Sequence, residues 1–283
     1  MQKRIIIVPP PEEGSSLIDF LSRTLNVSKK NAKKIIDARR VYVNNHPIWM
    51  AKHRLVLHDK IIVFNESFHA THNFPILYES NEFLIINKPY GILSNGKCSV
   101  EEIIQNNRHT KEIKAAHRLD RDTSGCLILA KNPMAKEIII QTFKTSKVRK
   151  IYLALVYGSL NAKELRIKTP LDDLPAETII TTQQANKKAS FLLISITTGR
   201  THQIRRHLAS IGHPIMGDYT YGTGHPLVKE IPPVPRQMLH AYKITFSLPS
   251  LEQITAMAPI PRDFYEYAAL LGLRIYPNKI NHL

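Results

Sequence analysis

Apolar runs rich in β-branched and aromatic residues recur through the last two thirds of the chain, and each ends in a turn signal. They are "FLIINKPYGIL" (83–93), "CLILA" (126–130), "IYLALVYG" (151–158), "SFLLISITTG" (190–199) and "AYKITFSLP" (241–249). Two other segments, 135–144 and 201–212, instead place apolar residues at helical spacing. This mixture predicts an α+β fold with a large mixed sheet and helices packed on it.

The overall charge narrows the class of partner. The chain of 283 residues has 39 Lys and Arg against 23 Asp and Glu, a formal net charge of +16. Such an excess favours a polyanion, either a nucleic acid or an acidic membrane surface, and does not choose between them. No apolar run approaches the roughly 20 residues that span a bilayer, and the start, "MQKRIIIVPPPEEG", has too short an apolar core for a signal peptide. We expect a soluble cytoplasmic protein with no membrane partner.

Cysteine and glycine usage argues against a bound cofactor. Cys98 and Cys126 are the only cysteines of the sequence, too few for a disulfide framework or a cysteine-based zinc site. We expect both to be reduced packing residues. The sequence has 11 glycines, and the lone G-x-G in "YGTGHP" (221–226) is typical of a plain loop. We therefore expect no cofactor and no metal.

The first organised segment is a small basic module. Apolar residues at helical spacing from Leu17 predict two short helices, the second capped by Ser28, and strand-like segments follow them. The second helix and its end are strongly cationic. The cationic residues are Lys29, Lys30, Lys33, Lys34, Arg39 and Arg40. They form either a solvated charged face or a surface that binds phosphates.

Residues 16–64 resemble the αL RNA-binding motif, a helix-helix-strand module found in a ribosomal protein and in several RNA-modifying enzymes. The resemblance implies that the six cations face an RNA backbone. The polar segment "HATHNFP" (69–75) ends in proline, which places a domain boundary nearby. We predict an RNA-binding domain over 14–66 and a second domain over 74–275.

The segment "HRLDRDTSG" (117–125) sets two aspartates among arginines. Guanidinium groups lower the pKa of a neighbouring carboxyl group, so such an aspartate is a poor proton donor near neutral pH. Asp122 precedes small residues and a glycine, which is typical of a turn cap. Asp120 ends an extended segment, and from the spacing alone it is either a buried ion-pair partner or a catalytic carboxylate.

"HRLDRDTSG" resembles the signature of the RluA/RluD-type pseudouridine synthases, which isomerise uridine in ribosomal or transfer RNA. Four further segments agree in the same order: "LIINKPYGIL" (84–93), "KIYLALVYG" (150–158), "TGRTHQIRRHLASIGHPIMGDYTYG" (198–222) and "RQMLHA" (236–241). The family also places an αL module ahead of its catalytic domain. The resemblance implies a mainly antiparallel catalytic sheet, an RNA partner and a monomer.

The same resemblance assigns roles to single residues. Asp120 matches the catalytic aspartate, Tyr152 the tyrosine that stacks on the target base, and Arg205 the arginine that pairs with the aspartate. Without the resemblance, Tyr152 reads as a core aromatic. Arg118 matches an arginine that fills the space left by the flipped base.

Other residues near these motifs are candidate RNA contacts. Lys88 belongs to a loop that lies near the site in the family, and Arg200 is a rival of Arg205 or a phosphate contact. His202 and His207 stand at no familiar metal spacing and lack an acidic cluster, so hydrogen bonding or RNA contact suits them better than a metal.

The implied reaction explains the residue types. The bond from the sugar to N1 must break, the uracil must rotate, and the bond must re-form at C5. A flipped base needs an aromatic platform, and the sugar, as it becomes positive, needs an ionised carboxylate that stabilises it, attacks it or removes a proton. The final C5 proton needs an acceptor, for which a tyrosine hydroxyl and a water both remain open.

Four alternatives remain. Glycoside hydrolysis requires a second carboxylate, for which Asp122 serves only if its turn assignment fails. A non-catalytic RNA-binding protein does not need Asp120, Tyr152 and Arg205 together, and a methyltransferase lacks its glycine-rich loop here. The fourth is a synthase acting on transfer RNA. We expect large-subunit ribosomal RNA as the substrate.

Overall fold

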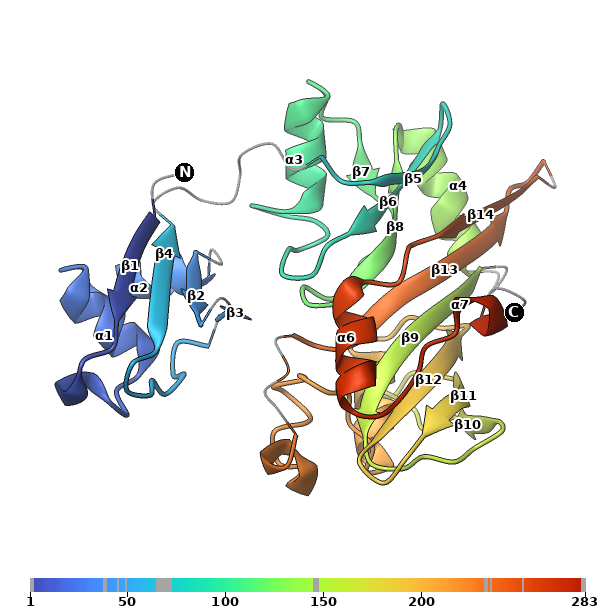
Figure 1. Cartoon of the computed structure of the whole chain (residues 1–283). Helices are drawn as coiled ribbons and strands as arrows, with labels where there is room; N and C mark the ends of the chain where they lie inside the picture. The colour runs from blue at the N-terminus through green and yellow to red at the C-terminus, as the bar shows by residue number, and fades with distance from the viewer. Residues whose placement is uncertain are drawn as a thin grey trace. The chain divides into compact units, whose positions relative to one another are not determined.

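The computed structural model describes residues 3–37, 40–44, 46–48, 50–64, 73–144, 148–231, 234, 236–250 and 252–280. The chain divides into two compact units, Met1–His72 and Asn73–Leu283 (Figure 1). Within the described residues, no helix is both long enough and apolar enough to cross a membrane.

The first unit packs two helices against a small antiparallel sheet. The helices are α1 (Leu17–Thr24) and α2 (Lys29–Asp37), and a short 3-10 turn, η1 (Pro10–Glu12), precedes them. The strand order is β1 (Lys3–Ile7), β4 (Lys60–Phe64), β2 (Val41–Val43) and β3 (His46–Pro47). Because β1 pairs along its length with β4, this unit starts before residue 14, the limit we expected from the helical pattern.

Serine caps begin both helices of this unit. The Ser16 hydroxyl accepts the Asp19 N–H at 3.3 Å, and the Ser28 hydroxyl accepts the Asn31 N–H at 3.2 Å. Phe20 of α1 and Ile36 of α2 meet in one buried cluster. The polar face of α2 is thereby left in solvent, and its exposed side chains include Lys29, Lys30, Lys33 and Lys34.

The second unit is built on one ten-stranded sheet. Its order is β10 (Leu165–Ile167), β11 (Thr178–Ala185), β12 (Ala189–Ile196), β9 (Arg149–Tyr157), β13 (Leu239–Ser247), β8 (Ser124–Ala130), β6 (Phe83–Lys88) and β5 (Ile76–Glu79). Two further strands, β14 (Gln253–Met257) and β7 (Lys114–Ala115), pair with β13 and β8. Every pairing is antiparallel except β8 with β13, so the predicted mixed, mainly antiparallel sheet is confirmed.

Both faces of this sheet are covered. Along β6, Leu84 and Ile86 belong to one buried cluster, and Phe83 and Ile85 belong to another. This explains why the strands read as continuous apolar runs rather than alternating ones. The covering elements are α3 (Val100–Asn107), α4 (Pro133–Lys144), α5 (Gln203–Ser210), α6 (Arg262–Leu270), α7 (Pro277–Ile280) and the 3-10 turn η2 (Pro226–Lys229) (Figure 1). Residues of α4 pack in the second cluster, and residues of α3, α5 and α6 pack in the first.

The two cysteines differ from each other in environment. Cys126 lies buried in β8, as expected of a packing residue, and burial raises the pKa of its thiol to about 12. Cys98 is exposed, at a backbone φ of 57°. The expectation that Cys98 packs in the core is therefore wrong, because its turn carries the side chain into solvent.

Buried His240 makes the stability of the fold depend on pH. Its Nε2–H donates to the Ala258 carbonyl at 3.4 Å, so its Nδ1 accepts the Ser124 hydroxyl at 2.9 Å. Burial lowers the pKa of His240 to about 4. Between pH 6.5 and 4 the unfolded chain therefore takes up a proton that the folded chain does not, and folding stability falls through that window.

We predict that the wild-type protein loses up to about 3 kcal/mol of unfolding free energy across this window through His240. Urea unfolding at pH 7 and pH 5 should show a smaller loss for His240→Gln, whose amide replaces the hydrogen bonds without titrating. His109→Asn is the matched control, because His109 is exposed and its φ of 52° suits asparagine. Equal losses in the wild type and His240→Gln would contradict the assignment.

Candidate active site

One open pocket of the second unit collects the residues that the sequence motifs single out. Its walls come from the segment 118–123, from β9, from the loop and helix 196–205, and from the start of β13. The lining side chains that can take part in chemistry are Arg118, Asp120, Tyr152, Arg200, His202, Gln203 and Arg205. Segments more than 80 residues apart in the chain thus meet at one place.

Asp120 is held by the backbone on both sides of it. The Thr123 N–H donates to the Asp120 carbonyl at 3.1 Å and closes a turn, and the Leu119 N–H donates to the Ser94 hydroxyl at 2.9 Å. The Ser94 hydroxyl in turn donates to the Leu119 carbonyl at 3.0 Å. This turn spans 120–123 and so begins two residues before Asp122, whereas we predicted a turn over the small residues that follow Asp122, of which Ser124 and Gly125 belong to β8. The Asp120 carboxylate lines the pocket.

Arg205 binds two carboxylates at once. Its Nη1 donates to Asp120 Oδ2 at 3.0 Å, as the predicted pairing requires. Its Nε and Nη2 donate to Asp218 at 2.6 Å and 2.9 Å, so Asp218 binds the guanidinium in a bidentate manner. Nη2 also reaches the Thr220 hydroxyl at 3.1 Å. The arginine therefore has a fixed orientation before it meets Asp120.

Asp218 is a residue of the site that the sequence reasoning missed. Its side chain has no exposed surface, and its Oδ1 also accepts the N–H groups of Thr220 and Tyr221 at 2.9 Å and 3.2 Å. It lies at the "GDYTYG" end of the segment 198–222. The feature that could have marked it as a site residue is an acidic side chain within a segment that matches the family. Its partner, however, is 13 residues away in a different element.

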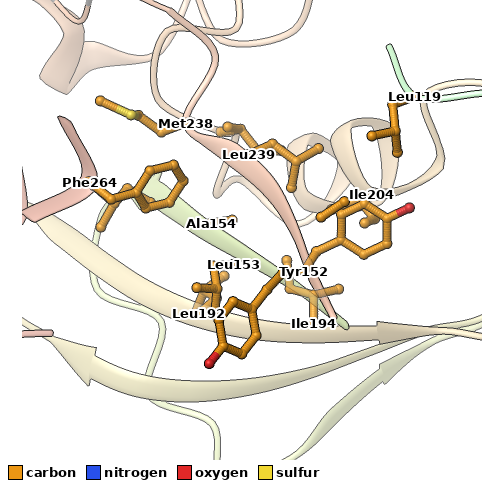
Figure 2. Close-up of a cluster of buried hydrophobic side chains, with 14 of the residues drawn as sticks. Leu119, Tyr152, Leu153, Ala154, Leu192, Ile194, Ile204, Met238, Leu239 and Phe264 are labelled. Carbon is orange, nitrogen blue, oxygen red and sulfur yellow. The ribbon is translucent and has the colours of Figure 1, made fainter. Parts of the chain in front are cut away.

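Tyr152 lies on β9, between Ile194 of β12 and Ala241 of β13. It is 8% exposed and belongs to the large buried cluster, where Figure 2 shows it with Leu119 and Ile204. Burial raises the pKa of its phenol, and the charge of Asp120 raises it further. The hydroxyl is therefore neutral at physiological pH, and the ring lines the pocket as a flat apolar wall.

Hydrogen bonds from Gln203 and Lys150 hold the loop before α5 in place. The Gln203 amide oxygen accepts the Arg200 N–H at 3.0 Å and the Thr198 hydroxyl at 2.8 Å. Buried Lys150 donates from Nζ to the Thr198 carbonyl at 3.1 Å, and burial lowers its pKa to about 8. Neither Lys150 nor Gln203 was predicted, although Lys150 opens the quoted segment "KIYLALVYG". Arg200 lines the pocket and donates from Nε to the Pro175 carbonyl at 3.1 Å.

Lys88 does not fit the expected RNA contact. Its side chain is fully buried, and its Nζ donates to the carbonyls of Pro89, Ile92 and Arg121 at 2.9, 2.7 and 3.0 Å. An ammonium group enclosed by carbonyl oxygens has no surface left for a phosphate. Lys88 therefore ties the loop after β6 to the turn that carries Asp120.

Arg236 supports the same turn from another direction. It is fully buried, binds Asp263 of α6 in a bidentate manner at 2.5 and 2.8 Å, and donates from Nη1 to the Ser124 hydroxyl at 3.3 Å. Gln237 beside it donates to the Thr123 hydroxyl at 2.9 Å. These bonds connect the start of β8, four residues after Asp120, to α6.

The two predicted histidines have different surroundings. His207 is buried, and its ring nitrogens lie 2.9 Å from the Thr178 hydroxyl and 2.9 Å from the Thr169 carbonyl, which makes it a structural residue. His202 lines the pocket, with its Nε2 3.8 Å from Asp120 Oδ1. Among the residues that the structure describes, no three His, Cys, Asp or Glu side chains gather as a metal site would require.

The remaining predicted RNA contacts fall in two places. Arg118 is exposed at the pocket. The four lysines of α2 are exposed on the first unit, and Arg40 is half-buried just after that helix. Arg39 lies outside the described residues.

Comparisons with known proteins decide the family. A family model described as RNA pseudouridylate synthase matches residues 82–210. The chain is 30% identical to an uncharacterized RNA pseudouridine synthase of Bacillus subtilis over 91% of this chain and 94% of that protein. It belongs to the RluA/RluD-type RNA pseudouridine synthases.

Two further matches agree. The enzyme is 32% identical to ribosomal large subunit pseudouridine synthase D of Nitrosomonas europaea, over 73% of this chain and 67% of that protein. The fold resembles human RNA pseudouridylate synthase domain containing 4, with a TM-score of 0.62 at 21% identity, over 71% of this chain and 94% of that chain. As a member of this family, the enzyme isomerises uridine in RNA.

We predict that Asp218→Asn lowers kcat by about 10²-fold while leaving RNA affinity unchanged, because a misplaced Arg205 no longer orients Asp120. The measurement is pseudouridine formation under saturating RNA, with affinity from filter binding. Asp172→Asn is the control: Asp172 pairs with the next arginine of α5, Arg206, but its side chain is 64% exposed. An Asp218→Asn enzyme with wild-type kcat would show that Asp218 does not position Arg205.

Proposed function

We propose that this enzyme acts in the cytoplasm on large-subunit ribosomal RNA, with Asp120 as the carboxylate that acts on the sugar. The observation that carries the proposal is the meeting of Asp120, Arg205 and Tyr152 in one pocket. The similarity to a ribosomal large subunit pseudouridine synthase supports the choice of RNA.

The pocket suits a uridine whose base is flipped out of the RNA base stack. Flipping costs a few kcal/mol, which stacking on an aromatic ring and contacts to the RNA backbone offset. In this proposal Tyr152 provides the ring, and Arg118, which is exposed at the pocket, fills the gap left in the RNA. Arg200 supplies a second cation for a neighbouring phosphate.

The two oxygens of Asp120 have different tasks. Oδ2 is occupied by Arg205 Nη1 at 3.0 Å, so Oδ1 is the oxygen that meets the sugar as the bond to N1 weakens and positive charge develops. From there the carboxylate stabilises the charge, attacks C1′ or removes a neighbouring proton. All three roles use the carboxylate, which Arg205 holds in place.

The first unit provides general RNA affinity. As proposed for an αL module, the exposed lysines of α2 pair with phosphates, and such contacts release counterions and weaken with salt. Lys29 is also bonded to Asp19 at 2.7 Å, so Lys30, Lys33 and Lys34 are the better candidates. This division leaves recognition of the flipped base to the second unit.

We predict that Asp120→Asn lowers the rate of pseudouridine formation by about 10⁴-fold or more and leaves RNA binding intact, since the amide cannot replace the charge. Single-turnover assays on transcripts of large-subunit ribosomal RNA test this. Chemical mapping of RNA from cells that lack the protein tests the substrate: a pseudouridine should disappear from that RNA and return with the wild-type gene only. Loss confined to transfer RNA would refute the choice of substrate.

We also predict that replacing Lys30, Lys33 and Lys34 by glutamine weakens RNA binding at low salt and lowers the slope of log affinity against log salt by up to about one per lysine. Filter binding at several salt concentrations measures both. Lys60→Gln is the control, because Lys60 is exposed on β4 of the same unit and not on α2. An unchanged slope would show that this face of α2 does not contact phosphates.

A further inference from the structure

The structure gives His202 an unusual setting that the reaction described above does not use. His202 stands at the N-cap of α5 with φ 54° and ψ 27°, in the left-handed region that is uncommon for residues other than glycine, although histidine enters it more often than most. Its side chain makes no capping hydrogen bond with the helix. The ring lines the pocket instead.

The imidazole is placed on the open side of Asp120. Its Nε2 lies 3.8 Å from Asp120 Oδ1, while Arg205 occupies Oδ2. Its Nδ1 lies 3.1 Å from the Tyr221 hydroxyl, which fixes the ring, and the Tyr221 ring lies 5.1 Å from the Arg205 guanidinium carbon. The separation of 3.8 Å is too long for a direct hydrogen bond, so the reacting nucleotide has access to both Nε2 and Oδ1.

We propose that His202 is the base that accepts the proton leaving C5 after uracil has rejoined the sugar. This inference rests on the proposed role of Asp120 at the sugar. In the step, the C5–H bond breaks, its electron pair restores the C5=C6 double bond, and the proton goes to Nε2. The imidazolium then releases the proton to solvent, and N1 gains one from solvent, so that the overall reaction is an isomerisation.

Other groups at the pocket are poorer proton acceptors. The arginines remain protonated. Tyr152 is kept as a neutral phenol by the burial that raises its pKa. Asp120 is engaged with the sugar. Of the side chains that line the pocket in the described ranges, His202 is the neutral titratable base.

Burial favours the neutral form of the imidazole. Burial lowers the pKa of His202, the charge of Asp120 opposes this, and the charge of Arg205 adds to it. The side chain is still 30% exposed, so a proton taken from the base can leave to solvent. The charged and titratable groups around the ring are Arg118, Asp120, Arg205, Asp218 and Tyr221. Activity therefore requires a pH above this lowered pKa and declines as the pH falls through it, below the ordinary value for histidine.

His202→Asn tests the proposal without straining the fold, because asparagine accepts the left-handed backbone. The substrate is total RNA from cells lacking the protein, labelled with ordinary or 5-deuterated uridine, which contains the target whichever RNA carries it. With enzyme in excess, we expect the variant to form pseudouridine about 10²- to 10³-fold more slowly than the wild type. We also expect a deuterium isotope effect that the wild type lacks, partial rescue by added imidazole, and loss of the acid limb of the pH–rate profile.

The matched control is Tyr221→Phe, which removes the hydroxyl contact to Nδ1 and keeps the imidazole and the aromatic ring. It should show neither the isotope effect nor rescue. A His202→Asn enzyme that is slow without these signatures would show that His202 only positions Asp120 or RNA, and one with wild-type rates would also overturn the proposal. Wild-type turnover on the transfer-RNA fraction alone would refute the proposed ribosomal substrate and leave the His202 result interpretable.

Discussion

The active site depends on one guanidinium shared between two carboxylates. Arg205 binds Asp218 through Nε and Nη2 and has Nη1 left for Asp120. Asp218 is completely enclosed, so removing its partner would leave a buried charge unpaired, at a cost of about 3–5 kcal/mol. The pair therefore stays formed throughout the reaction, and the orientation of Asp120 depends on the contact between α5 and the loop that carries Asp218.

The position of Asp120 also depends on contacts that are remote in sequence. Directly after its turn, Gly125 lies against Ala241 of β13 so closely that a Cβ would meet the Ala241 carbonyl. This is where β8 runs parallel to β13, the exception in an otherwise antiparallel sheet. Thr123 and Ser124 are hydrogen-bonded to Gln237 and His240, more than 110 residues further along the chain. The catalytic turn is thus fixed by contacts with the sheet in addition to the local bond from Thr123 to Asp120, so that chemistry and folding stability share the same residues.

Local pattern and motif predicted the apolar strands, both helices of the first unit, and the presence of Asp120, Tyr152 and Arg205 in one site. They did not predict contacts whose partners are distant. Asp218 looked like a loop residue because nothing near it in the chain shows that its partner is in α5. Lys88 was a candidate RNA contact because the sequence around a lysine does not show whether its ammonium group faces RNA or, as here, three backbone carbonyls. Strands β1 and β11 were not assigned, because each forms through pairing with other strands. β1 pairs with β4, and β11, whose sequence "TIITTQQA" is largely polar, pairs with β10 and β12.

Burial, with a smaller contribution from the shared guanidinium, explains how a carboxylate and an imidazole stand 3.8 Å apart without forming an ion pair. A protonated His202 would be drawn to Asp120 Oδ1 and would block the oxygen that must reach the sugar. Burial lowers the pKa of His202, and the charge of Arg205 lowers it further against the opposing effect of Asp120. Arg205 therefore orients one oxygen of Asp120, and its charge adds to the burial that disfavours protonation of His202 beside the other oxygen. A neutral substitute at position 205 would lose both effects, so it should impair the sugar step and the C5 proton step together.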